Sequence, residues 1–330
     1  MPKIKSLENK IFNISSHDEF NEVALEIFQF QYKNNIIYKR FVDFLDINTL
    51  DIVKYAQIPF MPVEFFKNHK ITTSNSTDDA VFTSSGTTGV ITSKHYVKDL
   101  TLYEKSFTNA FELMFGSITD FVILALLPSY LERTGSSLVY MADRLIKLCG
   151  NPESGFYLNE YKELHNLLKT LKAKKQKVIL LGVTYALLDL AEQFPVDFPE
   201  LILMETGGMK GKRKELIRDE LHNQLRKAFN IQNIFSEYGM TELLSQAYSV
   251  GGGLFRTPPW MKVLVRDVND PLSLLPTGKT GGLNIIDLAN IYSCSFIAVQ
   301  DLGKLHSDDT FEILGRFDSS DVRGCNLMVV

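Results

Sequence analysis

Residues 177–206 read KVILLGVTYALLDLAEQFPVDFPELILMET, and the fold class can be inferred from them. Two apolar runs of strand length, KVILLG from Lys177 and LILMET from Leu201, enclose a segment from Tyr185 to Phe194 with helical character. Runs of this kind are typical of strands buried on both faces, and an intervening helix is typical of a parallel crossover. This stretch therefore predicts an α/β fold in which helices join parallel strands.

The same alternation extends along the first 250 residues. AVFT around residue 81 and FVILALL from Phe121 are further strand-like runs, and residues 100–115, 136–148, 160–174 and 211–229 have helical patterns. The last of these helices is predicted to carry an apolar stripe of Leu216, Ile217, Leu221 and Leu225. We expect the strands to form parallel sheets with helices on their faces.

The two ends of the chain differ from this middle part. Ser16 and Glu19 form a capping box. The helix that follows it is predicted to bury Phe20, Val23, Ala24, Ile27 and Phe28. After residue 250, glycines, prolines and short strand-like pieces near Met261, Gly282 and Phe311 indicate a β-rich subdomain. We therefore expect an α/β core with a helical lead-in over residues 1–250, and a β-rich subdomain with a C-terminal tail over residues 251–330, packed as one unit.

Composition excludes several classes of protein. The chain has 330 residues, 45% hydrophobic and 22% charged, which is ordinary for a soluble enzyme. Its net charge of −4 and lack of a long basic run argue against nucleic acid as a partner. The polar start MPKIKSLENK and the shortness of every apolar run predict a cytoplasmic protein without a membrane span. Cys149, Cys294 and Cys325 have no metal-ligand spacing, so we expect free thiols.

The segment FTSSGTTG at residues 82–89 is suited to holding an oxyanion. Its glycines allow successive N–H groups to point inward, and its hydroxyls add donors. The lysine of the common G-x-x-x-x-G-K-[ST] phosphate loop is missing, because Val90 and Ile91 follow Gly89. Taken alone, such a run is more often a solvated turn or linker, so its function depends on other segments.

Three other segments are predicted to lie where strands end, the position at which open α/β sheets bind ligands. They are ETGGM at 205–209, EYGMTE at 237–242, and QDLG at 300–303 followed by ILGRFDSSDVRG at 313–324. With the loop at 82–89, their order and content resemble the acyl-adenylate-forming superfamily. Within that superfamily the chain most resembles the acyl-protein synthetase family, the fatty-acid-activating component of bacterial luminescence systems. The resemblance lies in the segments SSGTTG, which no proline follows, ETGGMKG, EYGMTELLSQ and DVRGC.

The resemblance covers roughly residues 50–326. It implies an adenylate-forming-enzyme-like N-terminal domain, with ATP and Mg²⁺ as cofactors. A fatty or other carboxylic acid would be converted to acyl-AMP, and the acyl group would then pass to a cysteine and on to a reductase or a carrier protein. Larger relatives continue from the position of Asp318 into a mobile domain that carries a lysine, which we expect to be absent here. Lys210, Lys212 and Arg213 are candidates to replace that lysine.

The resemblance also implies roles for individual residues. The predicted triphosphate and pyrophosphate ligands are Ser84, Ser85, Gly86, Thr87, Thr88 and Gly89, assisted by Lys94. Gly207 and Gly208 would let adenine lie on the backbone, with Tyr238 and the adjacent Gly239 on its other side. A tight turn, an exposed lysine and a core tyrosine are the plainer interpretations.

A second group of predicted residues lies around the α-phosphate and the ribose. Thr241 would bind the α-phosphate, and Glu242 would bind Mg²⁺. Asp301 would bind the ribose hydroxyls, and Arg316 the ribose or a phosphate. A helix N-terminus explains a Thr-Glu pair equally well, and a β-turn aspartate and a surface arginine are the plainer alternatives for the other two.

Cys325 is the residue that fits the family's acyl-accepting cysteine near the C-terminus. Arg323 beside it would favour the thiolate, and Gly324 would permit close approach. An inert buried thiol is the alternative, and Cys149 and Cys294 are predicted to be structural. Two other functions stay open: a ligase of the phenylacetate-CoA ligase type that acylates coenzyme A or a carrier-protein thiol, and a degenerate relative that binds nucleotide without turnover.

Overall fold

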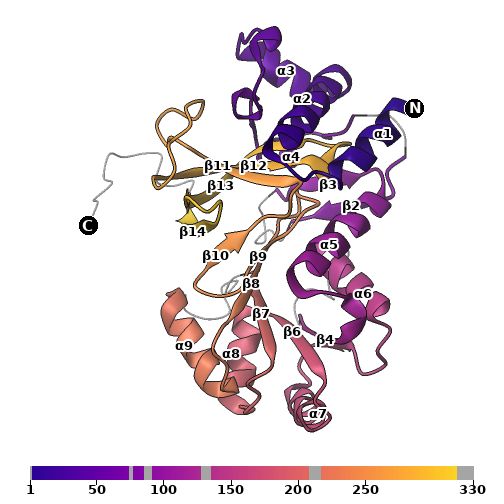
Figure 1. Cartoon of the computed structure of the whole chain (residues 1–330), viewed down its shortest axis with the longest axis vertical. Helices are drawn as coiled ribbons and strands as arrows, with labels where there is room; N and C mark the ends of the chain where they lie inside the picture. The colour runs from indigo at the N-terminus through magenta and orange to yellow at the C-terminus, as the bar shows by residue number, and fades with distance from the viewer. Residues whose placement is uncertain (1, 74–76, 85–90, 128–134, 208–216, 318–330) are drawn as a thin grey trace.

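The computed structural model describes residues 2–73, 77–84, 91–127, 135–207 and 217–317 (Figure 1). Parallel strands form one half of its main sheet: β4 (Phe121–Leu126), β5 (Gly155–Tyr157), β6 (Lys177–Val183), β7 (Ile202–Thr206) and β8 (Phe235–Tyr238). The strands β4, β6 and β7 correspond to the apolar runs in the sequence. The predicted parallel α/β core is therefore confirmed.

Antiparallel strands extend this sheet from β8. They are β9 (Ala247–Ser249), β10 (Leu254–Arg256), β11 (Met261–Arg266), β12 (Thr280–Asp287), β13 (Phe296–Leu305) and β14 (Phe311–Arg316), and the short β1 (Met61–Pro62) lies parallel to β13. The resulting 12-stranded sheet has the order β11-β12-β13-β14-β10-β9-β8-β7-β6-β4-β5. This confirms a β-rich C-terminal part. A continuous sheet crosses residue 250, and the domain division there stays a prediction.

The strand predicted at AVFT is present but is not a parallel strand. It is β2 (Ala80–Thr83), which pairs antiparallel with β3 (Lys94–Val97) in a separate two-stranded sheet. The prediction of a parallel partner was wrong because only residues 84–93 separate β2 from β3, whereas a parallel crossover needs about a dozen residues or more.

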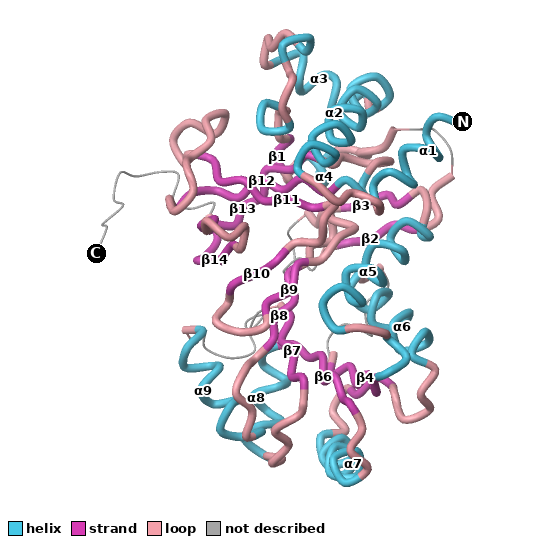
Figure 2. Tube along the Cα trace, viewed as in Figure 1, coloured by secondary structure: helices cyan, strands magenta, loops and turns pink. Residues whose placement is uncertain are grey.

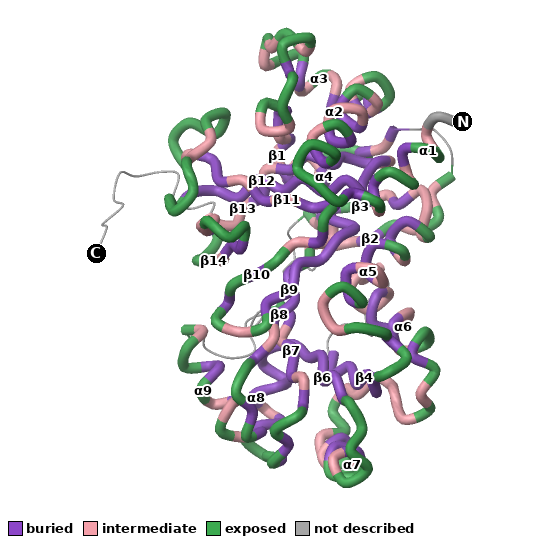
Figure 3. The backbone as a smooth tube through the Cα atoms, in the orientation of Figure 1, coloured by how far each residue is buried: buried purple, intermediate pink, exposed green. Residues whose placement is uncertain are grey.

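Helices cover both faces of the parallel half. They are α5 (Leu100–Phe115), α6 (Ser137–Cys149), α7 (Tyr161–Ala173), α8 (Thr184–Gln193) and α9 (Arg218–Phe229), with a 3₁₀ turn η3 (Ile118–Asp120) before β4. Figure 1 shows α8 and α9 on one side of β6 and β7, and α5 and α6 on the other. The first four helices agree with their predicted ranges to within one residue at each end. Figure 3 shows that the strands between them are buried, and β4 is buried along its whole length.

The helix predicted over residues 211–229 begins later than expected. The described helix starts at Arg218, because Ile217 has an extended backbone (φ −65, ψ 147). Leu221 and Leu225 are buried as predicted, whereas Ile217 is 73% exposed, so it does not belong to the apolar stripe. Leu216 lies outside the described residues.

The N-terminal helices pack against the antiparallel half of the sheet (Figure 2). They are α1 (Pro2–Ile11), α2 (His17–Asn34) and α3 (Ile36–Phe44), followed by η1 (Thr49–Asp51), η2 (Tyr55–Gln57) and α4 (Phe65–Asn68). The N–H of Glu19 donates to Ser16 Oγ at 3.2 Å, and the five predicted apolar residues of α2 are all buried. Within the described ranges, no helix is long and apolar enough to cross a lipid bilayer.

Gln31 of α2 anchors this helical layer to the sheet. Its amide nitrogen donates to the carbonyls of Asn290 (3.1 Å) and Ile291 (3.0 Å), and its amide oxygen accepts from Ser295 N–H (3.0 Å). The segment that it holds contains the turn η4 (Leu288–Asn290), which connects β12 to β13. Buried side-chain amides are stable when all their polar atoms have partners. The N-terminal helices therefore stabilise the turn η4, which lies beneath the candidate site.

Candidate active site

The ends of β7 and β8 lie side by side, as the sequence predicted for ETGGM and EYGMTE. Thr206 pairs in register with Glu237, and Thr206 Oγ1 donates to Glu237 Oε2 at 2.5 Å. Gly207 follows with φ 67, a conformation that favours glycine, and its carbonyl accepts from Thr184 Oγ1 at 2.7 Å. Gly208 lies outside the described residues. Gly207 therefore stands at the carboxyl end of β7, next to the end of β8.

Tyr238, Asp301 and Arg316 meet beside this edge. The Tyr238 hydroxyl donates to Asp301 Oδ2 at 2.8 Å. Asp301 and Arg316 are partners in the antiparallel pairing of β13 and β14, and Arg316 Nε lies 3.8 Å from Asp301 Oδ1. Three segments far apart in the sequence therefore supply one cluster. It consists of an aromatic ring, a carboxylate and a guanidinium.

One detail of this cluster differs from the sequence prediction. QDLG lies inside β13, which runs from Phe296 to Leu305, and not at a strand end. Tyr238 is the last residue of β8, and it is only 8% exposed because Phe255 and Phe311 pack against its ring edge to face. Burial raises the pKa of Asp301, while the Tyr238 hydrogen bond and the charge of Arg316 act in the opposite direction.

The stem of the loop at 82–89 is closed by two serines. Ser84 N–H donates to Ser93 O at 3.1 Å, and Ser93 N–H donates to Ser84 Oγ at 2.9 Å. Lys94 is the first residue of β3, exposed and opposite Thr83. Ser85, Gly86, Thr87, Thr88 and Gly89 lie outside the described residues. Lys94 therefore stands at the base of the loop whose phosphate role was predicted.

Glu242, the last residue of the EYGMTE motif, contacts the loop stem at Ser93. Its side chain is 5% exposed and is hydrogen-bonded to the Ser93 side chain. Burial raises the pKa of Glu242, and the Ser93 hydrogen bond together with the charges of Arg316 and Lys67 only partly offsets this. Among the residues that the structure describes, no lysine or arginine forms an ion pair with Glu242. A divalent cation would therefore stabilise this buried carboxylate.

The surroundings of Glu242 fit Mg²⁺ with few protein ligands. In the described part of the chain, no group of three or more histidine, cysteine or acidic side chains could hold a metal. Mg²⁺ commonly uses one or two carboxylates together with substrate phosphates and water. Glu242 next to Thr241 and the loop stem provides this donor set. Asp301 and Arg316, the predicted ribose ligands, add a hydrogen-bond acceptor and a cationic donor near this group.

The backbone around Thr241 and Glu242 is held by three residues that the sequence analysis missed. His95 Nδ1 lies 2.8 Å from Thr241 O, and Asn290 Nδ2 donates to Glu242 O at 2.8 Å. Asp287 accepts from the N–H groups of the next residues, Leu244 (2.7 Å) and Ser245 (3.0 Å). The available signal was the presence of polar residues within strand-like segments, KHYV and LNIIDLAN.

Two largely buried carboxyl groups lie on β7 and β8 next to this site. Glu205 accepts from His222 Nε2 (3.1 Å) and Ser236 Oγ (3.0 Å), and Thr184 Oγ1, which donates to Gly207 O, lies 3.2 Å from it. Burial raises the pKa of Glu205, but the hydrogen bond and charge of His222, the Ser236 hydrogen bond and the charge of Arg218 together outweigh it, and the net shift is downward. Burial raises the pKa of Glu237 to about 7, and the Thr206 hydrogen bond only partly opposes this. Both residues belong to motifs quoted from the sequence, but no role was predicted for either.

The two described cysteines are buried. Cys149 on α6 contacts Ile146 O at 3.0 Å, and burial raises the pKa of Cys294 to about 12. Neither has the properties of a reactive thiolate. Cys325 and the basic residues Lys210, Lys212 and Arg213 lie outside the described residues.

Known structures share this fold. ATP-bound MatB from Rhodopseudomonas palustris is 17% identical with a TM-score of 0.56, over 73% of this chain and 49% of that one. An open conformation of 2-hydroxyisobutyryl-CoA ligase, in complex with 2-HIB-AMP and CoA, is 14% identical with a TM-score of 0.66, over 93% and 72%. The chain thus spans about half the length of MatB. At these identities the likeness establishes the adenylate-forming-enzyme fold.

Sequence comparison identifies the family. No curated protein sequence is significantly similar to this chain. The family model for acyl-protein synthetase, LuxE, matches residues 7–330, which is nearly the whole chain. The motifs at 82–89, 205–209, 237–242 and 300–303 lie within that match. The chain therefore belongs to the acyl-protein synthetase (LuxE) family.

Proposed function

We propose that the protein activates a carboxylic acid with ATP and Mg²⁺ and then accepts the acyl group on Cys325. The observation that carries this proposal is the convergence of Tyr238, Asp301 and Arg316 beside Glu242 and the loop stem. Ribose hydroxyls need hydrogen-bond acceptors, triphosphate needs donors and cationic charge, and the metal needs a carboxylate. The cluster offers each of these within one part of the fold.

In the first proposed step, a carboxylate oxygen of the acid attacks the α-phosphorus of ATP. The new oxygen–phosphorus bond forms as the bond to the bridging oxygen breaks, and pyrophosphate leaves with the electron pair. Hydroxyl and N–H donors at the loop after Ser84, with Lys94 at its base, would bind the leaving group. Mg²⁺ on Glu242 would offset the charge that develops on the phosphates.

In the second proposed step, the Cys325 thiolate attacks the acyl carbonyl and AMP leaves. The last described residue, Phe317, donates its N–H to Gln300 O at 2.7 Å, one residue before Asp301. Cys325 follows eight positions later. At about 3.5 Å per residue, the thiol lies within about 28 Å of that anchor. The tail thus starts at the proposed ribose site, and its length is compatible with a return of Cys325 to that site.

Other thiols do not suit this step. Cys149 and Cys294 are buried, and the pKa of Cys294 is raised far above neutrality. Family membership supports a fatty acid as the substrate and a reductase or carrier protein as the next acceptor. A soluble CoA thiol is the competing acceptor.

Acid-dependent exchange of radiolabelled pyrophosphate into ATP tests the first step. A panel of fatty acids of different lengths, with acetate and phenylacetate as comparisons, would be assayed with and without Mg²⁺. The proposal predicts exchange that requires both Mg²⁺ and a fatty acid. Lack of exchange with every acid would refute adenylation and favour a nucleotide-binding protein without turnover. Exchange accompanied by release of acyl-CoA, when CoA is added, would favour the CoA ligase.

A further inference from the structure

His95 joins two parts of the proposed active site. It lies on β3, directly after the loop stem, and its side chain is fully buried. Its two ring nitrogens face different elements: Nδ1 lies 2.8 Å from Thr241 O, and Nε2 lies 3.0 Å from Asn290 Oδ1. The Phe66 ring of α4 packs against the imidazole edge to face, with 5.6 Å between centroids. The ring is therefore fixed in one orientation.

Asn290 extends this link to Glu242. Its amide nitrogen donates to Glu242 O (2.8 Å) and to Cys294 O (2.9 Å). Two carbonyl partners require a nitrogen at that position, so the Asn290 oxygen must face His95. Through one imidazole and one amide, β3 is thus connected to the carbonyl oxygens of both Thr241 and Glu242.

The imidazole therefore faces two acceptors. Burial lowers the pKa of His95 to about 4, although its hydrogen bonds to Thr241 and Asn290 act upward, so the ring is neutral at neutral pH. A neutral imidazole has one N–H and can donate to one oxygen only. The shorter contact, to Thr241 O, assigns this N–H to Nδ1. Nε2 then carries no proton and faces Asn290 Oδ1 at 3.0 Å without donating to it.

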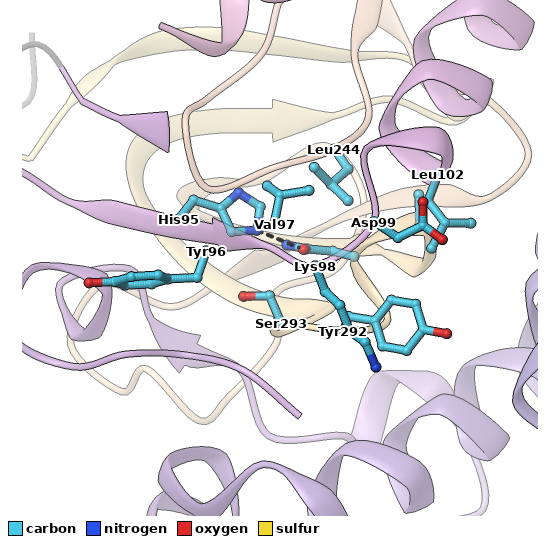
Figure 4. A pocket seen from close by; sticks show the side chains of 11 residues that line it. His95, Tyr96, Val97, Lys98, Asp99, Leu102, Leu244, Tyr292 and Ser293 are labelled. Carbon is cyan, nitrogen blue, oxygen red and sulfur yellow. Dashed lines mark hydrogen bonds between the residues drawn. The ribbon is translucent and has the colours of Figure 1, made fainter. Parts of the chain in front are cut away.

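A cavity lies next to this link. Its volume is only about 10 Å³, and His95, Asn290, Leu244 and Tyr292 line it together with Val97 and Leu102 (Figure 4). The link is therefore closely packed on this side of β3. Directional hydrogen bonds to Thr241, Glu242 and Leu244 add to this packing and fix the position of the 241–245 segment.

We propose that His95 is a positioning residue of the proposed adenylation reaction, one that holds β3 and the loop stem before it in register with Thr241 and Glu242. This rests on the proposed function. Just before β3, Ser93 closes the loop stem against Ser84 and is hydrogen-bonded to Glu242. His95 adds a second link, from β3 to Thr241 O. Together the two links keep the loop stem and Lys94 at a constant distance from Thr241 and Glu242, which would bind the α-phosphate and Mg²⁺.

Two substitutions separate the two polar contacts of the ring. In His95→Asn the amide nitrogen occupies the place of Nδ1 and keeps the donation to Thr241 O. In His95→Gln it occupies the place of Nε2, keeps Asn290 and loses Thr241. We expect His95→Gln to raise the KM for Mg-ATP at least about tenfold, as loss of one buried hydrogen bond allows, and His95→Asn to change it less than about threefold.

Binding of Mg-ATP without acid, measured by calorimetry, should show the same order, with Asn tighter than Gln. His165→Gln is the matched control, because His165 on α7 contacts Phe194 O at 3.2 Å away from the site; it should leave both values unchanged. A residue that only fills space would show the opposite order, since glutamine replaces more of the ring volume. That order, or wild-type values in both variants, would overturn the inference.

A measurement on the unsubstituted protein does not depend on the variants folding. Nitrogen-15 NMR of the histidine rings should show His95 neutral, with its proton on Nδ1, and shifted when Mg-ATP is added. A His95 signal that does not respond to Mg-ATP would contradict the inference. If the wild-type chain binds Mg-ATP but shows no acid-dependent exchange, the proposed function fails; if it does both and only the order of the variants is reversed, the His95 inference alone fails.

Discussion

The Tyr238 hydroxyl donates a 2.8 Å hydrogen bond to Asp301 Oδ2, linking β8 to β13 across 63 positions of the chain. Asp301 is mostly buried, and burial raises its pKa. The tyrosine hydroxyl helps to keep this carboxyl ionised and oriented, because a hydrogen bond to the charged form favours that form. Tyr238 thus orients Asp301, the residue proposed to bind the ribose, and it ends the strand β8 that pairs with β7 just before Gly207.

Tyr238→Phe should weaken ATP binding without unfolding the protein. The ring and its contacts with Phe255 and Phe311 remain, whereas Asp301 loses its donor. A hydrogen bond to a charged group contributes about 1.5–3 kcal/mol, so the KM for ATP should rise at least about tenfold. Steady-state exchange kinetics measure this. Tyr248→Phe on β9 is the control and should keep the wild-type KM; equal effects in both variants would argue against a specific role.

Glu242→Gln should raise the Mg²⁺ concentration needed for half-maximal exchange by about tenfold or more. The amide keeps the size of the side chain but removes the charge that binds the metal. The pKa of Glu242 is raised, so protons compete with Mg²⁺ as the pH falls, and the wild-type Mg²⁺ requirement should increase toward acid pH. In the variant this pH dependence should be reduced. An unchanged Mg²⁺ titration in the variant would exclude Glu242 as the metal ligand.

Glu237→Gln should stabilise the protein at alkaline pH. Burial raises the pKa of Glu237 from its usual 4.5 to about 7, so the folded state favours the protonated form. The stability this gives is complete below pH 4.5 and is lost as the pH rises through 7. Glutamine has no such loss, and its amide oxygen can still accept from Thr206. Urea unfolding should show an advantage for the variant of up to about 3 kcal/mol at pH 8.5, and little at pH 5.

A variant that is equally destabilised at both pH values would indicate that Glu237 is needed as an acceptor and not as a proton-binding group. Matched unfolding of Glu205→Gln provides the contrast. The net shift in the pKa of Glu205 is downward, so its ionised form is stabilised and the substitution should destabilise the protein at neutral pH.

Asp287→Asn should destabilise the fold by roughly 3 kcal/mol, since the carboxylate accepts from Leu244 N–H, Ser245 N–H and Ser245 Oγ. An amide places N–H groups against at least one of these donors. Asp120→Asn is the control: its ion pair with Lys177 is exposed, so the cost should stay below about 1 kcal/mol. Similar unfolding midpoints for the two variants would contradict the role assigned to Asp287.

The parallel core could be predicted from the sequence because strands such as β4 are apolar at every position and their helices carry clear caps and stripes. β2 could not be placed correctly, because a short apolar run does not reveal its partner strand. β9 was missed: it has three residues and ends in the buried polar Ser249, so it lacks the apolar signal of a strand.

The candidate site could be predicted only where a motif carries the chemistry. Tyr238, Asp301 and Arg316 were named in the sequence, but the pairing of Asp301 with Arg316 depends on β13–β14 register, which motifs do not contain. His95, Asp287 and Asn290 were missed because each acts on a backbone group far along the chain. A contact of this kind depends on the tertiary fold and has no spacing of its own.

Intact-mass analysis of the purified protein after incubation with ATP, Mg²⁺ and a mixture of fatty acids tests the central claim most directly. The account predicts a single acyl adduct that hydroxylamine removes, that requires ATP, and that is lost in Cys325→Ala but kept in Cys149→Ala. An adduct that persists in Cys325→Ala, or no adduct while acid-dependent exchange proceeds, would contradict acyl transfer to this cysteine.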